Sequence, residues 1–245
     1  MKIEDGRANE LSPHPEKSQV YASAAIVQRR KRILKETRKL IAEVGVQGFS
    51  VRQLCLRSGV ALRTLYNAFH SKDRLIAIAI REAYDEVERS VEYRTSADTL
   101  EGIVDRLVFM NTRNMGARNY TKAVASLYFA PDVGEDIWLA LQHMVFRNLR
   151  QWLNRVAAEG NLQPGVNIDE LAMMLANLEY STMNDWAQGR ISDGDFIRRL
   201  VQSVLRVAVS TMVGEPRRQA QDYIDEINAT EKAPSFPAPI FRRQA

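Results

Sequence analysis

One stretch, residues 49–75, constrains the fold of this chain more than any other. Ser50 is a good N-cap for a helix, and Gln53 three positions later completes a capping box. Gly59 permits the left-handed conformation that ends a helix and turns the chain sharply. A second short helix then turns three side chains inward: Leu65, Ala68 and Phe69. The stretch therefore predicts a helix-turn-helix, in which the second helix enters the major groove of DNA.

Charge is unevenly distributed along the sequence. The chain has a net charge of +4, whereas residues 26–75 contain twelve Lys or Arg and three acids, a net charge of +9. A basic head on a mildly acidic body indicates that one end of the molecule meets a polyanion. A plainer explanation is that the basic run Arg29–Arg32 is only a solvated helix start, but it accounts less well for the helix-turn-helix pattern after that run.

The composition favours a helical protein without membrane spans. Only 12 glycines and 8 prolines leave room for long helices, and no segment alternates as a strand would. No stretch approaches the ~18 apolar residues that cross a bilayer. The single cysteine, Cys55, excludes an internal disulfide and fits a reducing compartment. Because the first residues also lack the apolar run of a signal peptide, we expect a soluble, cytoplasmic, all-α protein.

Breaks in the apolar periodicity divide the chain into four parts. Residues 1–25 contain Pro13 and Pro15 and are predicted to form a flexible arm, with the first helix running from about Ile26 to Val44. Residues 26–75 form the helix-turn-helix domain, and residues 76–229 form a larger helical body. Residues 230–245 contain three prolines in a polar context and are predicted to be disordered.

The helix-turn-helix also carries a specific resemblance. Its residues read Gly59-Val60-Ala61-Leu62-Arg63-Thr64-Leu65-Tyr66, followed by Phe69, Ser71-Lys72-Asp73 and Leu75. This pattern resembles the signature of the TetR/AcrR family of transcriptional regulators over roughly residues 29–90. The resemblance implies an N-terminal three-helix head, joined by a connecting helix to a helical bundle that binds ligands and dimerises.

Matching positions imply specific roles in DNA binding. Side chains at the starts of helices contact phosphates, and exposed positions of the second helix contact the groove and its base edges. The candidate DNA-binding residues are Ser50, Arg52, Leu62, Arg63, Thr64, Tyr66, Asn67, His70 and Lys72. For His70, a capping or surface role is an equal alternative. The sequence departs from the family at Ala61, where a Ser or Thr cap is usual, and at Asn67-Ala68, so an operator preference cannot be carried over.

In the body, the resemblance implies a ligand pocket and a dimer interface. The pocket should be apolar with adaptable methionines. Its candidate residues are Phe109, Met110, Tyr128, Met144, Trp152, Met174 and Asn177. Two-fold dimers match palindromic half-sites, and relatives use the last two long body helices, here residues 167–188 and 193–213. The candidate interface residues are Tyr180, Met183, Trp186, Leu200, Val204 and Val207.

The resulting hypothesis is a homodimeric repressor that a small-molecule effector releases from a palindromic operator. One alternative is a ligand-sequestering or non-specific DNA-binding protein whose head no longer reads sequence. Another is an enzyme in the bundle pocket, although His14, His70 and His143 lie far apart and no metal, phosphate or dinucleotide motif is present. We therefore expect no catalytic residue, metal or cofactor. Cys55 fits a small core residue better than a redox sensor.

Overall fold

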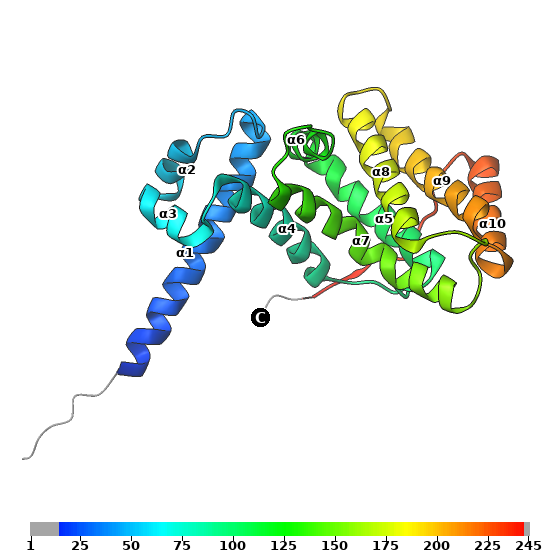
Figure 1. Ribbon diagram of the computed structural model, residues 1–245, viewed down its shortest axis with the longest axis horizontal. Coiled ribbons are helices and arrows are strands. Elements are labelled where there is room, and N and C mark those ends of the chain that lie inside the picture. The colour runs from blue at the N-terminus through cyan, green and yellow to red at the C-terminus, as the bar shows by residue number, and fades with distance from the viewer. Residues whose placement is uncertain (1–14, 243–245) are drawn as a thin grey trace, which may run out of the picture.

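The computed structural model describes residues 15–242, and Figure 1 shows a small helical head beside a larger helical body. The head contains α1 (Pro15–Val44), α2 (Val51–Ser58), α3 (Leu62–Phe69) and the start of α4 (Lys72–Ser90). The body contains α5 (Leu100–Gly116), α6 (Arg118–Tyr128), α7 (Glu135–Ala158), α8 (Ile168–Ala187), α9 (Asp193–Thr211) and α10 (Gly214–Thr230). The all-α prediction is confirmed, with one small addition, the pair of strands β1 (Val91–Glu92) and β2 (Ile240–Phe241).

Local caps set the helix boundaries of the head. The Ser50 hydroxyl accepts a hydrogen bond from the Gln53 backbone N–H at 3.4 Å, and Ser71 caps α4 in the same way through Arg74 at 3.0 Å. Gly59 follows α2 with φ of 62°, and its N–H bonds to carbonyls of the last turn. These short-range signals place α3 directly after the turn.

The first helix begins earlier than the sequence predicted. It starts at Pro15 rather than near Ile26, so residues 15–25 are helical and not part of an arm. Proline suits the first helical position because its missing N–H needs no partner there. The alanines later in this segment are strong helix formers. The rest of the predicted arm, residues 1–14, lies outside the described residues.

A continuous apolar core holds α1, α2 and α3 together. Leu54, Leu65 and Phe69 are each fully buried against apolar residues of α1 and α4. Ala68, which the sequence placed inward, is exposed. It lies on the side of α3 away from this core, because Leu65 and Phe69, four residues apart, already fill the inward face.

Two contacts connect the head to the body. The connecting helix α4 packs along α7, and α1 packs against α6. Behind them, α8 packs between α6 and α9, while α10 covers the far side of α9. Any change in the position of α4 or α6 in the body therefore acts directly on the helices of the head.

The C-terminal segment differs from the predicted disorder. Residues 231–242 run back along the body, and β2 pairs antiparallel with β1, with Val91 opposite Phe241. The Arg242 N–H donates to the Ser90 carbonyl at 2.9 Å, and Phe236 packs against the core. Apolar side chains interspersed among the prolines supply this attachment, and a proline does not prevent a short edge strand. Residues 243–245 lie outside the described part.

No helix within residues 15–242 has the length and apolar character needed to cross a bilayer.

Candidate functional site

The outer face of α3 presents a continuous polar and aromatic surface. Leu62 and Tyr66 are 43% and 40% exposed, and Arg63 and Asn67 are also exposed, whereas Thr64 is half-buried. The opposite face of this helix is anchored by fully buried side chains. A helix fixed on one side and open on the other can enter a groove without rearrangement. Five of the predicted DNA-binding positions therefore lie on one short helix, with four of them open to solvent.

The other four predicted positions surround α3 in different ways. Ser50 and Arg52 are exposed at the start of α2. His70 is exposed, adopts φ of 67°, and ends α3 through an N–H bond to the Tyr66 carbonyl at 2.8 Å. Lys72 is half-buried, with its Nζ 3.5 Å from the Val46 carbonyl. The structure thus brings Arg52 and His70 to the open surface and holds Lys72 against the loop between α1 and α2.

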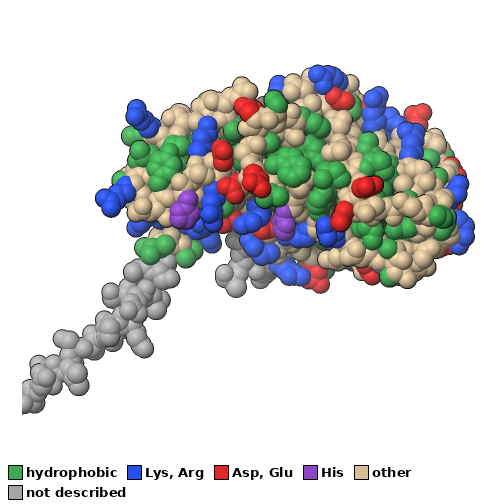
Figure 2. Space-filling model, in the orientation of Figure 1, with side chains coloured by type: hydrophobic (Ala, Val, Ile, Leu, Met, Phe, Trp, Pro, Cys, Tyr) green, Lys and Arg blue, Asp and Glu red, His purple; other side chains and the backbone are tan. Residues whose placement is uncertain are grey.

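Two arginines near α3, Arg52 and Arg63, differ from Arg57 in their ion pairing. Arg57 forms a two-point contact with Glu43, with N···O distances of 2.8 and 2.6 Å. This contact lowers the pKa of the Glu43 carboxyl and raises that of the Arg57 guanidinium. In the described residues, no acid forms an ion pair with Arg52 or Arg63. Figure 2 shows Lys and Arg side chains on the outer end of the head.

The start of α3 lacks a side-chain cap. Ala61 has the extended backbone of an N-cap, with φ of −71° and ψ of 149°, but offers no oxygen to the free amides of the first turn. We expect Ala61→Ser to stabilise α3 by about 1 kcal/mol, because serine accepts a hydrogen bond there without moving the backbone. Hydrogen exchange at the α3 amides, together with thermal unfolding followed by the helical circular dichroism signal, measures this gain in stability.

Ala68→Ser provides the matched control for that prediction. It makes the same chemical change on the same helix, at an exposed position within its last turns, where serine is a weaker helix former than alanine by about 0.5 kcal/mol. If Ala61→Ser protected the α3 amides no more than Ala68→Ser does, the missing cap would not weaken the helix.

Two further observations concern the reactivity of the cysteine and the binding of metal ions. Cys55 is half-buried and burial raises the pKa of its thiol, which disfavours the reactive thiolate. Residues 15–242 contain no cluster of three or more His, Cys, Asp or Glu side chains arranged to bind a metal ion.

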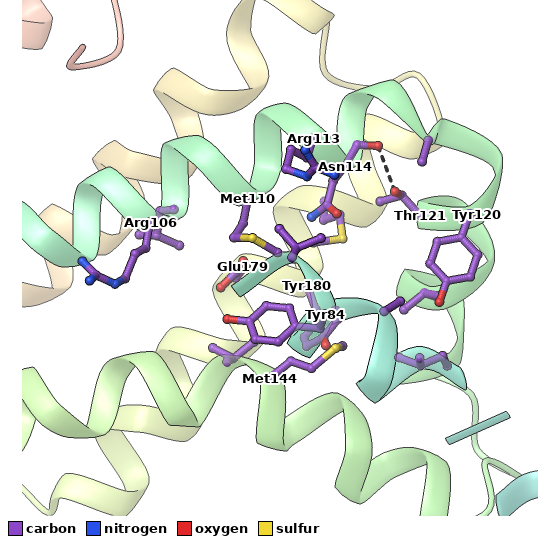
Figure 3. A pocket seen from close by; sticks show the side chains of 18 of the residues that line it. Tyr84, Arg106, Met110, Arg113, Asn114, Tyr120, Thr121, Met144, Glu179 and Tyr180 are labelled. Atoms are coloured by element: carbon purple, nitrogen blue, oxygen red, sulfur yellow. Dashed lines mark hydrogen bonds between the residues drawn. The ribbon is translucent and has the colours of Figure 1, made fainter. Parts of the chain in front are cut away.

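The body contains a cavity of about 530 Å³ lined by residues of α4, α5, α6, α7 and α8. Figure 3 shows side chains from these helices converging on it. The walls are predominantly apolar and include Ile80, Val87, Ile103, Leu107, Met110, Val124, Met144, Val145, Leu149 and Met183. Both the size and the apolar character suit a small organic ligand.

A few polar groups also line the cavity. The Glu179 carboxylate accepts a hydrogen bond from Asn111 Nδ2 at 3.0 Å, and burial raises the pKa of this carboxyl. The Tyr120 hydroxyl is buried and has no hydrogen-bond partner in the described part of the chain. Thr121 donates to the Asn114 carbonyl at 2.9 Å, as Figure 3 shows. Glu179 and Tyr120 therefore retain capacity for a ligand.

The structure places only two of the seven predicted pocket residues, Met110 and Met144, in the cavity wall. Phe109 packs instead against Tyr93 and Phe241. Trp152 is 1% exposed in the core, and Met174 is 41% exposed on the outer side of α8. The remaining two bond to each other beside the cavity, Tyr128 donating to Asn177 Oδ1 at 2.6 Å. An apolar helical pattern indicates burial and leaves open which buried face borders a cavity.

The predicted interface residues are mostly core residues of the protomer. Each of these side chains is at most 6% exposed: Tyr180, Met183, Trp186, Leu200 and Val204. Tyr180 and Met183 line the cavity, and Val207 is half-buried. The exposed side chains of α8 and α9 are instead Asp169, Glu170, Met174, Asn177, Ser181, Asp193, Arg199, Arg206 and Ser210.

Sequence reasoning missed Tyr84, Tyr120 and Glu179 in the cavity wall. Glu179 could have been noticed, because it is an acid within the predominantly apolar segment Leu171–Met183 of a predicted helix.

Comparison with known proteins identifies the head. Residues 33–78 match a family described as bacterial regulatory proteins, tetR family. They extend from α1 through the whole helix-turn-helix into α4. The head is a TetR-type helix-turn-helix domain.

One relative in sequence and two solved structures extend the likeness. YvaF of Bacillus subtilis (strain 168), an HTH-type transcriptional regulator, is 33% identical over 99 residues, which are 38% of this chain and 52% of that protein. The match thus spans about half the length of this relative. TylP, a TetR regulator of Streptomyces fradiae, has a TM-score of 0.57 at 20% identity, over 82% of this chain and 98% of that chain. GusR of Salmonella enterica has a TM-score of 0.53 at 22% identity, over 74% and 95%. At these identities, the structural likeness concerns the TetR fold alone.

Proposed function

We propose that this TetR-family chain is a homodimeric, sequence-specific transcriptional repressor that a small-molecule effector releases from a palindromic operator. The observation that carries the proposal is the pairing of two features in one chain. One is the open face of α3, which presents Arg63, Tyr66 and Asn67, and the other is a predominantly apolar cavity whose walls include α4 and α6. Both helices contact the head or continue into it.

The arrangement of the head supports recognition of DNA. Arg63 and Asn67 are exposed on α3, and these residue types pair with guanine and adenine edges in the major groove. Arg52 at the start of α2 is available to a phosphate, and the free amides of helix starts also attract anions. Phosphate contacts supply affinity, while α3 supplies the sequence preference.

Dimerisation is expected from the size of the head and the surface of the body. One helix-turn-helix module buries too little DNA for tight specific binding, so two copies on two half-sites are usual. We place the interface on the exposed side chains of α8 and α9, because their other faces are filled by the protomer core.

The cavity and the head are joined by α4 and α6. Ile80, Tyr84 and Val87 of α4 line the cavity, and only two residues separate the end of α3 from the start of α4. On α6, Tyr120 borders the cavity and lies within the electrostatic field of Arg38 on α1, which partly offsets the effect of burial on the tyrosine pKa. A ligand that favours one position of these helices changes the spacing of the two α3 helices and weakens the operator complex.

Footprinting on the DNA that flanks the coding region tests this proposal. We expect two protected half-sites separated by about one helical turn, ~34–36 Å. Light scattering should give a dimer mass at micromolar concentration, and a ligand that occupies the cavity should remove the footprint. A strict monomer, or a footprint that forms only when the ligand is present, would contradict the repressor mechanism.

A further inference from the structure

The cavity wall contains a carboxylate that has no ion-pair partner among the side chains that the structure describes. Glu179 points into the cavity from α8, between Met110 and Tyr180 in Figure 3. The amide of Asn111 donates a hydrogen bond to it, and no ion pair among the side chains described in residues 24–147 and 149–242 includes it. Because an unpaired buried charge is costly, burial favours the neutral form of this carboxyl, and a positive charge beside it would stabilise the carboxylate.

Arg106 and Arg113, the arginines of the wall whose side chains the structure describes, do not serve as that partner. Arg106 donates to the Gly102 carbonyl at 2.8 Å, and its guanidinium carbon lies 4.2 Å from the ring centroid of Tyr93. Figure 3 shows it directed away from Glu179. Arg113 is exposed, and its guanidinium lies 5.9 Å from the ring centroid of Phe109. Consistent with this geometry, neither arginine contributes to the pKa of the Glu179 carboxyl, which burial raises.

A second polar group in the cavity also lacks a partner. The Tyr120 hydroxyl is buried at the α6 side of the cavity and makes no hydrogen bond within the described residues. Buried hydroxyls are normally paired, and exceptions mark places where a ligand or water binds. The cavity therefore offers an acid and a hydroxyl to an occupant that is otherwise apolar.

We propose that the ligand of this cavity is a hydrophobic amine, an apolar molecule whose protonated amine pairs with Glu179. The ammonium group supplies the missing positive charge, and its hydrogen bonds to a carboxylate are of the strong, charge-assisted kind. The methionines Met110, Met144 and Met183 adapt to varied apolar shapes. The same carboxylate disfavours a ligand with a carboxylate or phosphate beside it, because like charges repel strongly in an enclosed apolar site. This inference rests on the proposed function only in taking the cavity as the effector site.

Three probes with the same alkyl chain isolate the contribution of the charge. Decylamine, decanol and decanoate are titrated into the full chain by isothermal calorimetry, below the concentrations at which they form micelles. We expect decylamine to bind at least about tenfold more tightly than decanol, since one charge-assisted hydrogen bond contributes about that factor. Decanoate should bind more weakly than decanol.

Two variants locate the preference. In Glu179→Gln, which keeps an acceptor for Asn111, decylamine should lose its advantage of about tenfold while decanol affinity stays within about twofold. Removing a buried acid should leave thermal unfolding unchanged or raise its midpoint, which controls for folding. Tyr120→Phe is the matched cavity variant, and it should leave decylamine binding within about twofold, because this probe carries no second polar group.

Several results would overturn the inference. Decanoate binding as tightly as decylamine would show an anion site, and an amine preference that persists in Glu179→Gln would place the ammonium elsewhere. Binding of none of the three probes would also refute it. DNA affinity is measured in the same samples. If decylamine binds without releasing DNA, the effector mechanism is contradicted, while the inference that the cavity binds a hydrophobic amine is supported. If only a molecule without an amine releases DNA, the effector mechanism is supported and the amine inference is contradicted.

Discussion

Replacing Arg63 or Tyr66 by alanine is expected to weaken binding to operator DNA by about ten- to a hundredfold, because a good side-chain contact to a base or groove contributes about 1–3 kcal/mol. Both side chains are exposed on α3 and take no part in the core, so thermal unfolding should not change. Arg63→Ala should mainly remove the preference for operator over scrambled DNA, whereas Tyr66→Ala should weaken binding to both. Fluorescence anisotropy with labelled duplexes measures these effects.

Arg217→Ala is the control for that comparison. It removes one positive charge from an exposed position on α10, at the far end of the body from the head. We expect its affinity for operator DNA to stay within about twofold of the unaltered protein, because charges beyond a Debye length of ~10 Å are screened. If Arg217→Ala weakened binding as much as Arg63→Ala does, binding would respond to total charge and not to the α3 surface.

The second large effect is expected for Trp186→Ala, which should lower the free energy of unfolding by about 3–5 kcal/mol. Trp186 is 1% exposed and stacks on Phe196 with ring centroids 4.8 Å apart. The Arg118 guanidinium lies 4.5 Å from the Trp186 ring centroid, and the Trp186 Nε1–H donates to Asp193 Oδ1 at 2.8 Å. Trp186→Phe keeps the stacking and should lose only about 1 kcal/mol with the hydrogen bond. Denaturant unfolding followed by circular dichroism gives both values.

Trp138→Ala supplies the comparison, because this tryptophan of α7 is only half-buried. Its truncation should destabilise the protein less than that of Trp186. The pair also tests the revised position of Trp186, which the sequence assigned to the dimer interface. If Trp186→Ala weakened self-association while leaving the unfolding of the protomer unchanged, the side chain would face a partner and not the core.

Local features of the fold were predictable because their causes lie within a few residues. Ser50 and Asn167 cap helices by accepting amides two or three positions ahead, and Gly59 adopts the left-handed backbone that ends α2. Such signals require no knowledge of tertiary structure. The helix-turn-helix combines several of them within residues 49–75, which is why the head could be assigned before the body.

The faces of the body helices could not be assigned in this way. The apolar periodicity assigned Tyr180 and Trp186 to the dimer interface, yet the same periodicity fits a dimer interface and a protomer core. Packing between α6, α8 and α9 decides the choice, and that packing joins residues far apart in the chain. Glu179 illustrates the same limit, since an acid on a helix is ordinary until the surrounding helices enclose it.

The two ends of the chain differ from the prediction for a related reason. Prolines indicate irregular chain by composition, whereas Pro15 begins α1 and the proline-rich C-terminal segment attaches to β1 through β2. Position within an element determines the effect of a proline. In the C-terminal segment, the decisive factor is the distant strand at Val91–Glu92, which no local pattern reveals.

Specific DNA binding is the central claim, and anisotropy at two salt concentrations tests it most directly. The DNA is a palindromic fragment from the region flanking the coding sequence, compared with a scrambled duplex of the same composition. We expect the palindrome to bind about a thousandfold more tightly, at the lower end of specific protein–DNA complexes, and both affinities to fall as salt rises. Equal, steeply salt-dependent binding to the two duplexes would contradict the account, because α3 would then contribute charge without reading sequence.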